Sequence, residues 1–299
     1  MPDKHRDLII TAASESYRPQ LLSMLASLRC NWPGHPPVLV YSIDLSEETV
    51  ELVRQAGFEV HAIPQFVPHW RKHYTWKFWC MNDAPAERVL WLDAGVFVLR
   101  PLPEIFDIVV KQGYFALPNH QRLEMEASEQ ACEGCGVPPE FRAGKVTVIS
   151  AVFGFLRGSA IEQVVQECLR VARTERFIQA TRPEHRWEQA ILSLLMYRDI
   201  SQLILCDGSL YFCEDLSAKF TVHSIWAARR FMHYKDQRFL ATCLVGPVSP
   251  FIPRSSHKLT WWFQSALKVR NAMRTIKGLL TGTQSQVLNR HVPMDGVVR

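Results

Sequence analysis

Asp93 is a single carboxylate that follows a hydrophobic run of strand length, and Gly95 comes two residues after it. Residues 89–92 and 96–98 on either side are apolar, which predicts that Asp93 lies at the carboxyl edge of a buried strand. Ligands bind at this edge in open α/β sheets, and a glycine there lets a phosphate group or a metal ion approach the backbone closely. An acid followed by a glycine is also common in simple turns. The stretch alone leaves both interpretations open.

The segment before Asp93 alternates between strand and helix patterns. Apolar runs predict strands at residues 8–13, 38–42 and 58–63. Ser16 and Ser46 are placed to cap the two helices between these strands. This order predicts an α/β fold with a mostly parallel, mixed sheet and helices on both faces, which is a three-layer α/β/α arrangement.

Two charged residues lie on predicted helices. Lys77 belongs to a short helix over residues 75–83 and has aromatic neighbours, so its side chain either meets a ligand or extends along an aromatic helix face. Glu188 lies beside the apolar stripe of a later helix, which predicts a position near the boundary of the packed face. A solvated glutamate paired with Arg182 or Arg186 is the alternative.

The packed domain is predicted to span residues 1–253 and to end in the proline-rich stretch 246–253. The periodic pattern breaks down over residues 119–145, which predicts an insertion or a mobile flap near the site. Apolar runs at 146–155 and 202–206 predict further strands of the domain.

The order of these elements, together with the motif around Asp93, resembles a known family. Residues 92–95 read Leu-Asp-Ala-Gly and are followed at 99–102 by Leu-Arg-Pro-Leu. This pattern resembles the GT-A nucleotide-sugar glycosyltransferases, and among them the family that includes glycogenin and the bacterial galactosyltransferases of lipopolysaccharide assembly. The likeness covers residues 7–117. The family motif is Asp-x-Asp, so Gly95 stands where the second acid is expected.

The resemblance implies transfer of a sugar from a nucleotide diphosphate, with a UDP-sugar as the expected donor and a saccharide or a lipid-linked molecule as the acceptor. Residues 11–17 are similar to the first loop of the family, which implies that Thr11, Ala12 and Tyr17 lie against the nucleotide. The family also has a basic residue on the helix before the motif, which implies that Lys77 contacts a phosphate group.

A divalent ion would neutralise the charge that builds up on the leaving diphosphate. Mn²⁺ or Mg²⁺ takes oxygen ligands and keeps water and substrate phosphate in its shell, so Asp93 could be a sufficient protein carboxylate. The resemblance implies a late histidine as a second metal ligand, and His223 is the candidate. Because Gly95 replaces the second acid, a metal-free site is also open, in which Asp93 binds ribose or sugar hydroxyls and cations such as Lys77 neutralise the phosphates.

The resemblance leaves two alternative roles open for Glu188. In an inverting transferase it would deprotonate the acceptor hydroxyl, and in a retaining one it would orient the sugar. Two other functions are open. Gly95 favours a non-catalytic member of the fold that binds nucleotide sugars, whereas a sugar nucleotidyltransferase is disfavoured because residues 11–17 contain no glycine or lysine for a phosphate-binding loop.

Basic charge is concentrated at the carboxyl end of the chain. Residues 254–299 hold eight of the 34 Lys and Arg residues against one acid, Asp295, so this tail carries a net charge of +7 and the remainder −2. The main domain is therefore not expected to bind nucleic acid. Residues 261–280 form a basic amphipathic pattern, which predicts either peripheral contact with an anionic membrane or a helix packed back on the domain.

The amino-terminal residues are charged and run directly into a predicted strand, and no apolar stretch is long enough to span a bilayer. Eight irregularly spaced cysteines favour reduced thiols over a disulfide framework. Both features predict a cytoplasmic protein, located peripherally on the inner face of the membrane if the tail binds there.

Overall fold

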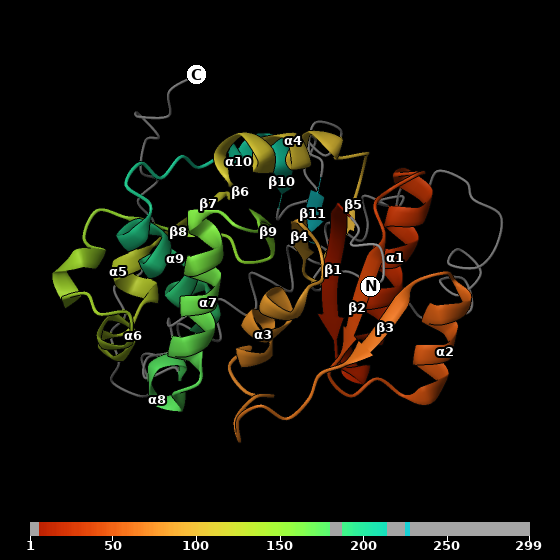
Figure 1. Ribbon diagram of the computed structural model, residues 1–299, viewed down its shortest axis with the longest axis horizontal. Helices are drawn as coiled ribbons and strands as arrows, with labels where there is room; N and C mark the ends of the chain where they lie inside the picture. Colours follow the sequence, from red (N-terminus) through yellow and green to blue (C-terminus); the bar gives the residue numbers. More distant parts are fainter. Residues whose placement is uncertain (1–5, 180–186, 214–224, 228–299) are drawn as a thin grey trace, which may run out of the picture.

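A mixed sheet of six strands forms the centre of the protein (Figure 1). The computed structural model describes residues 6–179, 187–213 and 225–227. The strands are ordered β3-β2-β1-β4-β9-β6, and β9 runs antiparallel to both of its neighbours while the other pairs are parallel. Their bounds are β1 (Asp7–Ala13), β2 (Val38–Ser42), β3 (Glu59–Ala62), β4 (Arg88–Leu92), β6 (Tyr114–Phe115) and β9 (Val152–Leu156). The predicted mostly parallel, mixed sheet is confirmed.

Helices cover both faces of this sheet. One apolar core joins the strands to α1 (Arg18–Asn31), α2 (Glu47–Gln55) and α4 (Pro103–Gln112). A second core joins them to α3 (Thr75–Asp83), α7 (Ala160–Ala172) and α9 (Trp187–Asp199). Figure 1 shows α1 and α2 on one side of the strands and α3, α7 and α9 on the other. The predicted three-layer α/β/α arrangement is therefore confirmed.

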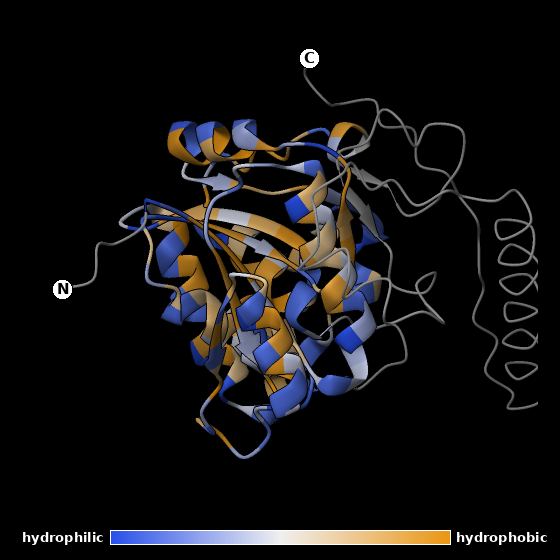
Figure 2. Cartoon of the chain, turned by 90° about the vertical axis from the view of Figure 1, so that its right-hand side faces the viewer, coloured by the Kyte–Doolittle hydropathy of each residue, from blue (hydrophilic) through white to orange (hydrophobic). Residues whose placement is uncertain are grey.

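Burial on both faces explains why the strands read as continuous apolar runs. Ile9 of β1 packs in the core beside α1, while its neighbour Ile10 packs in the core beside α3, and both are fully buried. Leu90 and Trp91 of β4 divide in the same way. A strand with two buried faces needs apolar residues at every position instead of at alternate ones. Figure 2 shows the resulting distribution, with mostly hydrophobic strands inside and helices that turn hydrophilic residues outward.

Two smaller sheets flank the central one. One has the order β10-β11-β5, and the other pairs β7 with β8. Their bounds are β5 (Val96–Val98), β7 (Pro118–Arg122), β8 (Val146–Val148), β10 (Phe212–Cys213) and β11 (Ile225–Ala227). The remaining described elements are η1 (Glu15–Tyr17), α5 (Leu123–Glu126), α6 (Glu129–Gly134), η2 (Pro139–Arg142), α8 (Glu175–Ile178) and α10 (Gly208–Tyr211).

Residues 119–145 contain all but the first residue of β7, together with α5, α6 and η2, and Leu123, Ala131 and Cys132 among them are fully buried. The interpretation of this segment as an insertion or flap stays a prediction. The strand predicted at 202–206 is wrong, because these residues form no strand and lead into α10.

Helix starts agree with the sequence at one of the two predicted caps. Ser46 caps α2, and its hydroxyl accepts a hydrogen bond from the Thr49 amide. The cap predicted at Ser16 is wrong, because Ser16 lies inside η1 and α1 begins at Arg18. None of the helices in the described part of the chain combines the length and the hydrophobicity that a bilayer crossing requires. Residues 261–280 lie outside the described residues.

Gly154 of β9 packs tightly against α4 and β6. A Cβ added there would lie 2.8 Å from Val109 Cγ2 and 3.1 Å from Phe115 Cβ, so Gly154→Ala should lower the free energy of unfolding by about 1–3 kcal/mol. Urea unfolding measures this effect. Gly208→Ala is the control, because its Cβ would lie an ordinary 3.5 Å from the Pro118 carbonyl oxygen, and the expected loss is below about 0.5 kcal/mol. Equal losses in the two variants would contradict the packing argument.

Candidate functional site

A cleft of about 400 Å³ opens where the parallel strands β1, β2 and β4 end. This is the edge at which open α/β sheets bind ligands. The cleft is lined by Ala12, Ala13, Ser14, Tyr17, Ile43, Asp44, Arg71, His73, Tyr74, Trp76, Asp93, Ala94, Gly95, Ser150, Trp187, Glu188 and Gln189. Its walls thus come from the loops after three strands, from the segment before α3 and from the start of α9.

Five of the residues singled out in the sequence line this cleft, namely Ala12, Tyr17, Asp93, Gly95 and Glu188. Thr11 does not, because it lies one residue further back in β1 and is fully buried. Lys77 is also buried, with only 1% of its surface exposed, and lies behind the cleft wall. His223 lies outside the described residues.

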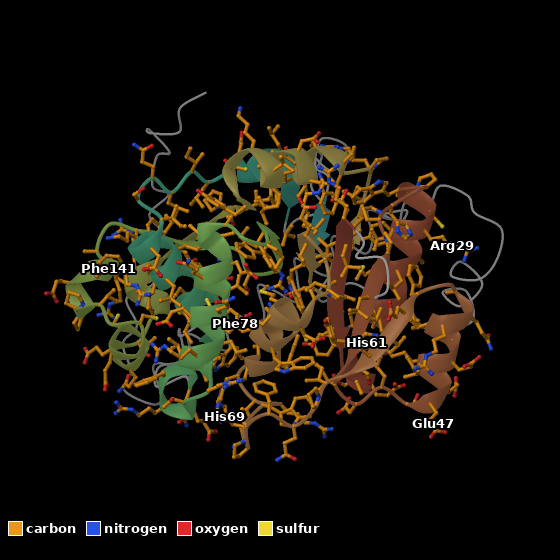
Figure 3. All side chains as sticks on the ribbon, in the orientation of Figure 1. Arg29, Glu47, His61, His69, Phe78 and Phe141 are labelled. Carbon is orange, nitrogen blue, oxygen red and sulfur yellow. The ribbon has the colours of Figure 1, made fainter. Side chains whose placement is uncertain are left out.

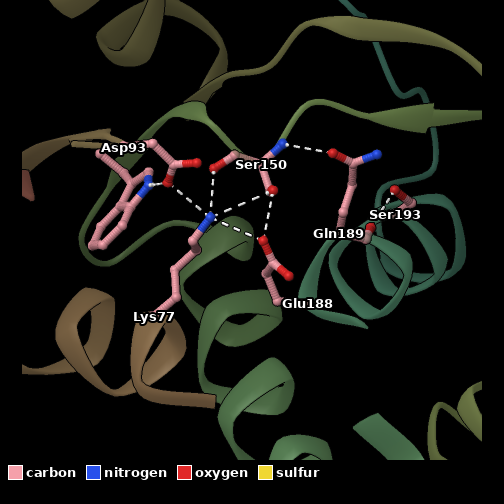
Figure 4. Close-up of polar contacts among 7 residues, drawn as sticks. Lys77, Asp93, Ser150, Glu188, Gln189 and Ser193 are labelled. Carbon is pink, nitrogen blue, oxygen red and sulfur yellow. Dashed lines mark hydrogen bonds and ion pairs between the residues drawn. The ribbon is translucent and has the colours of Figure 1, made fainter. Parts of the chain in front are cut away.

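The ammonium group of Lys77 joins the two predicted carboxylates (Figure 4). Its Nζ lies 2.8 Å from Asp93 Oδ1 and 3.0 Å from Glu188 Oε1. It also donates to the carbonyl oxygen of Ser150 at 3.3 Å. Lys77, Asp93 and Glu188, which the sequence singles out separately, therefore form one charged cluster.

Burial alone would lower the pKa of Lys77, but the neighbouring Asp93 and Glu188 outweigh it and the pKa is raised above the ordinary lysine value. The ammonium group is accordingly charged at neutral pH. It also lies 5.3 Å from the centre of the Trp91 ring, a cation–π distance. Lys77 is thus a buried positive charge that lies between two carboxylates.

Asp93 is held by the strand that delivers it. Its backbone amide donates to the Ala151 carbonyl at 2.8 Å, just beyond the pairing of β4 with β9. Its Oδ1 accepts a hydrogen bond from Trp91 Nε1 at 2.7 Å in addition to that from Lys77. These contacts fix the carboxylate at the strand end, where 21% of its side chain stays accessible from the cleft.

Glu188 and Gln189 at the start of α9 are positioned by the segment that joins β8 to β9. The Ser150 hydroxyl donates to Glu188 Oε1 at 3.0 Å, and the Ser150 amide donates to Gln189 Oε1 at 3.5 Å (Figure 4). Gln189 Nε2 donates in turn to Thr147 Oγ1 at 3.3 Å. This chain of contacts ties α9 to the sheet, so the position of the Glu188 carboxylate depends on the register of α9 against β8.

Three non-glycine residues in the described part of the chain have left-handed backbone conformations, and all three line the cleft. His73 has a φ of 56°, Tyr74 of 57° and Trp187 of 26°. Such conformations cost about 1–3 kcal/mol each and gather at functional sites. The rings of Tyr74 and Trp187 lie 5.4 Å apart, so the strained backbone brings an aromatic pair to the rim beside Glu188.

The segment before α3 supplies site residues that the sequence does not reveal. Arg71 is the one Lys or Arg among the described residues that line the cleft. Its guanidinium lies 4.8 Å from the centre of the buried Trp70 ring and donates to the Ile43 carbonyl at 3.2 Å. The buried His69 anchors the segment through a 2.8 Å contact with the Ala172 carbonyl at the end of α7 (Figure 3).

Comparison with known proteins supports the fold. No protein-family model matches the chain. No curated protein matches its sequence. Among solved structures, the fold is similar to the apo structure of WbbM, a bifunctional glycosyltransferase, with a TM-score of 0.51 and 11% sequence identity. The chain has a glycosyltransferase-like fold. The similar region covers 79% of this chain and 47% of that one, so this chain spans about half the length of WbbM.

The glycosyltransferase-like fold raises the question of a metal ion, and the residues at the cleft fit one poorly. Gly95 offers no carboxylate, and Oδ1 of Asp93 already accepts from an ammonium and an indole. No group of three or more His, Cys, Asp or Glu side chains among the described residues is arranged to hold a metal. The predicted Mn²⁺ or Mg²⁺ site with Asp93 and His223 stays a prediction, because His223 is not among these residues.

Proposed function

We propose that this protein is a glycosyltransferase that moves a sugar from a nucleotide-diphosphate sugar, most simply a UDP-sugar, to a saccharide or lipid-linked acceptor. The observation that carries the proposal is the cluster of Lys77, Asp93 and Glu188 at the strand-end cleft of a glycosyltransferase-like fold. Both carboxylates line the cleft, so Asp93 can bind hydroxyls of the donor sugar while Glu188 can meet the acceptor.

The walls of the cleft suggest how the donor lies. The backbone at Ala12 and the ring of Tyr17, which is 44% exposed, would receive the nucleotide base. Gly95 carries no side chain on the floor of the cleft, so the diphosphate can approach the backbone there, with the Arg71 guanidinium on the adjacent wall. Asp93 would then bind hydroxyls of the donor sugar.

Glu188 is the group proposed to meet the acceptor. As the acceptor oxygen attacks the anomeric carbon, the bond from that carbon to the diphosphate oxygen breaks and the nucleoside diphosphate leaves with the electron pair. Glu188 would take the proton of the attacking hydroxyl as general base. The Ser150 hydroxyl and Lys77 hold one of its oxygens, which orients the carboxylate for this transfer.

A non-catalytic nucleotide-sugar-binding protein is the second candidate, favoured by Gly95 at the position of the second acid. Slow hydrolysis of the bound donor separates the two functions, because a transferase passes sugar to water whereas a binding protein returns the donor intact. Cytoplasmic location, absence of nucleic acid binding and contact of residues 261–280 with the inner membrane face belong to the proposal as well.

Titration calorimetry with UDP, GDP, CMP and their sugars tests the proposal. Asp93→Asn should weaken binding of the recognised nucleotide sugar by at least about tenfold, because a carboxylate-to-hydroxyl bond of this kind contributes about 1.5–3 kcal/mol. Glu51→Gln on the outer surface of α2 is the control and should bind as wild type does. Failure of every nucleotide and nucleotide sugar to bind the wild type would disprove the proposed function.

A further inference from the structure

The Lys77 ammonium occupies a shell made of oxygen atoms. Asp93 Oδ1 lies 2.8 Å from Nζ, Glu188 Oε1 3.0 Å, the Ser150 carbonyl oxygen 3.3 Å and the Ser150 hydroxyl 3.5 Å. Two carboxylates, a carbonyl and a hydroxyl form the kind of donor set that hard divalent cations prefer. These oxygen atoms therefore form a cation site, and the Lys77 ammonium group occupies it.

With the Lys77 ammonium group in this position, a second cation cannot bind the same oxygen atoms. A divalent ion that bound Asp93 and Glu188 together would have to displace the ammonium group of a fully buried lysine that is ion-paired to both. Two like charges a few ångströms apart in a poorly solvated site repel each other strongly. Gly95 adds no carboxylate that could draw the ion to another position on the cleft floor.

We propose that Lys77 is the resident cation of the cleft and takes the place of a divalent ion, so that the donor binds without metal. The part of this inference that concerns binding of the donor rests on the proposed function. Lys77 acts here as a positioning residue: it holds Asp93 and Glu188 at fixed separation. The charge of the leaving diphosphate is met by Arg71, the cation on the wall of the cleft.

The first experiment uses the wild-type protein and the nucleotide sugar found by titration. Its affinity should be the same in EDTA as in Mn²⁺, within about twofold, because the cation that balances the carboxylates is covalently part of the chain. Loss of binding in EDTA that added Mn²⁺ restores would overturn the inference while leaving the proposed function intact. Arg71→Gln should weaken binding of the nucleoside diphosphate but leave binding of the free nucleoside unchanged, and an equal effect on both would also count against it.

The second experiment needs no nucleotide. Lys77→Ala empties the oxygen shell, so electron paramagnetic resonance of Mn²⁺ titrations should show at least about tenfold tighter binding than in wild type, because two buried carboxylates without a counter-charge attract a divalent ion. Lys145→Ala is the matched control. Its ammonium also lies on an aromatic ring, 4.2 Å from the centre of Phe141, but belongs to no such shell, and no Mn²⁺ binding should be gained.

Lys77→Met gives a second reading if the alanine variant does not fold, because its side chain keeps the apolar packing of the lysine stem while removing the charge. Mn²⁺ should raise the melting temperature of whichever variant folds and leave that of wild type unchanged. If wild type binds Mn²⁺ and the Asp93→Asn substitution abolishes this binding, the inference is overturned. Since these readouts involve no donor, they stand or fall independently of whether the protein transfers sugar.

Discussion

Replacing Lys77 with methionine should lower the free energy of unfolding by about 3–5 kcal/mol, because it leaves two largely buried carboxylates without their shared counter-charge. Asp93 and Glu188 expose only 21% and 9% of their side chains, so solvent screens them weakly. Because the pKa of Lys77 is raised in the folded state, its contribution is complete below the ordinary lysine pKa and is lost only as the pH rises through the folded value. Urea unfolding at neutral pH therefore measures the whole effect.

Two further variants separate charge from packing. Lys145→Met removes a half-buried lysine over an aromatic ring and should cost below about 1 kcal/mol. Adding Asp93→Asn and Glu188→Gln to Lys77→Met should recover much of the stability, because a buried ion group can be replaced by neutral groups of the same shape at little cost. A triple variant as unstable as Lys77→Met would show that the loss comes from packing of the lysine stem.

Glu188→Gln should lower the rate of sugar transfer by about 10²–10⁴-fold, the range that a general base contributes. The amide retains an oxygen to accept from Lys77 and Ser150, so the geometry of the cleft should persist. Affinity for the nucleotide sugar should change by less than about threefold, since Glu188 is placed on the acceptor side and contributes little to binding of the donor in its ground state. Single-turnover release of nucleoside diphosphate from the bound donor, with water as acceptor, measures the rate.

A pH profile distinguishes the base from a residue that only positions others. The rate profile of wild type should contain a limb that belongs to its general base, and Glu188→Gln should lack this limb. Glu51→Gln on the surface of α2 should keep both the rate and the profile of wild type. A Glu188→Gln rate equal to that of wild type would rule out the assigned role.

Much of the fold could be predicted because the strands are buried on both faces. Continuous apolar runs predict the strands β1 and β4, and the predicted helix over residues 75–83 coincides with α3. The strand predicted at 202–206 failed for a physical reason. Leu203 and Leu205 pack against the core, but the segment forms no strand ladder: Cys206 N donates to the Ala116 carbonyl and Ile204 N donates to the Tyr114 hydroxyl. An apolar run can therefore bury its side chains from a loop.

The site was predictable residue by residue but not as an assembly. Asp93 could be found because it follows an apolar strand, Glu188 because it lies beside the apolar stripe of a helix, and Lys77 because it is a charge within an aromatic helix. Their meeting depends on β9 lying next to β4, a long-range pairing that leaves no local sequence signal. The left-handed turn at His73 and Tyr74 was equally hidden, since neither residue is a glycine, the residue that marks such a turn in a sequence.

The ion pair between Lys77 and Glu188 also determines when, during synthesis of the chain, the cleft can first form. The two residues are 111 positions apart in the chain, and the partner strand β9 follows Lys77 by more than seventy residues. A ribosome adding about 5–20 residues per second reaches Glu188 about 5–20 seconds after Lys77. Throughout that interval the nascent chain holds a lysine whose second carboxylate has not yet been made, so the binding cleft appears only when α9 has emerged and docked.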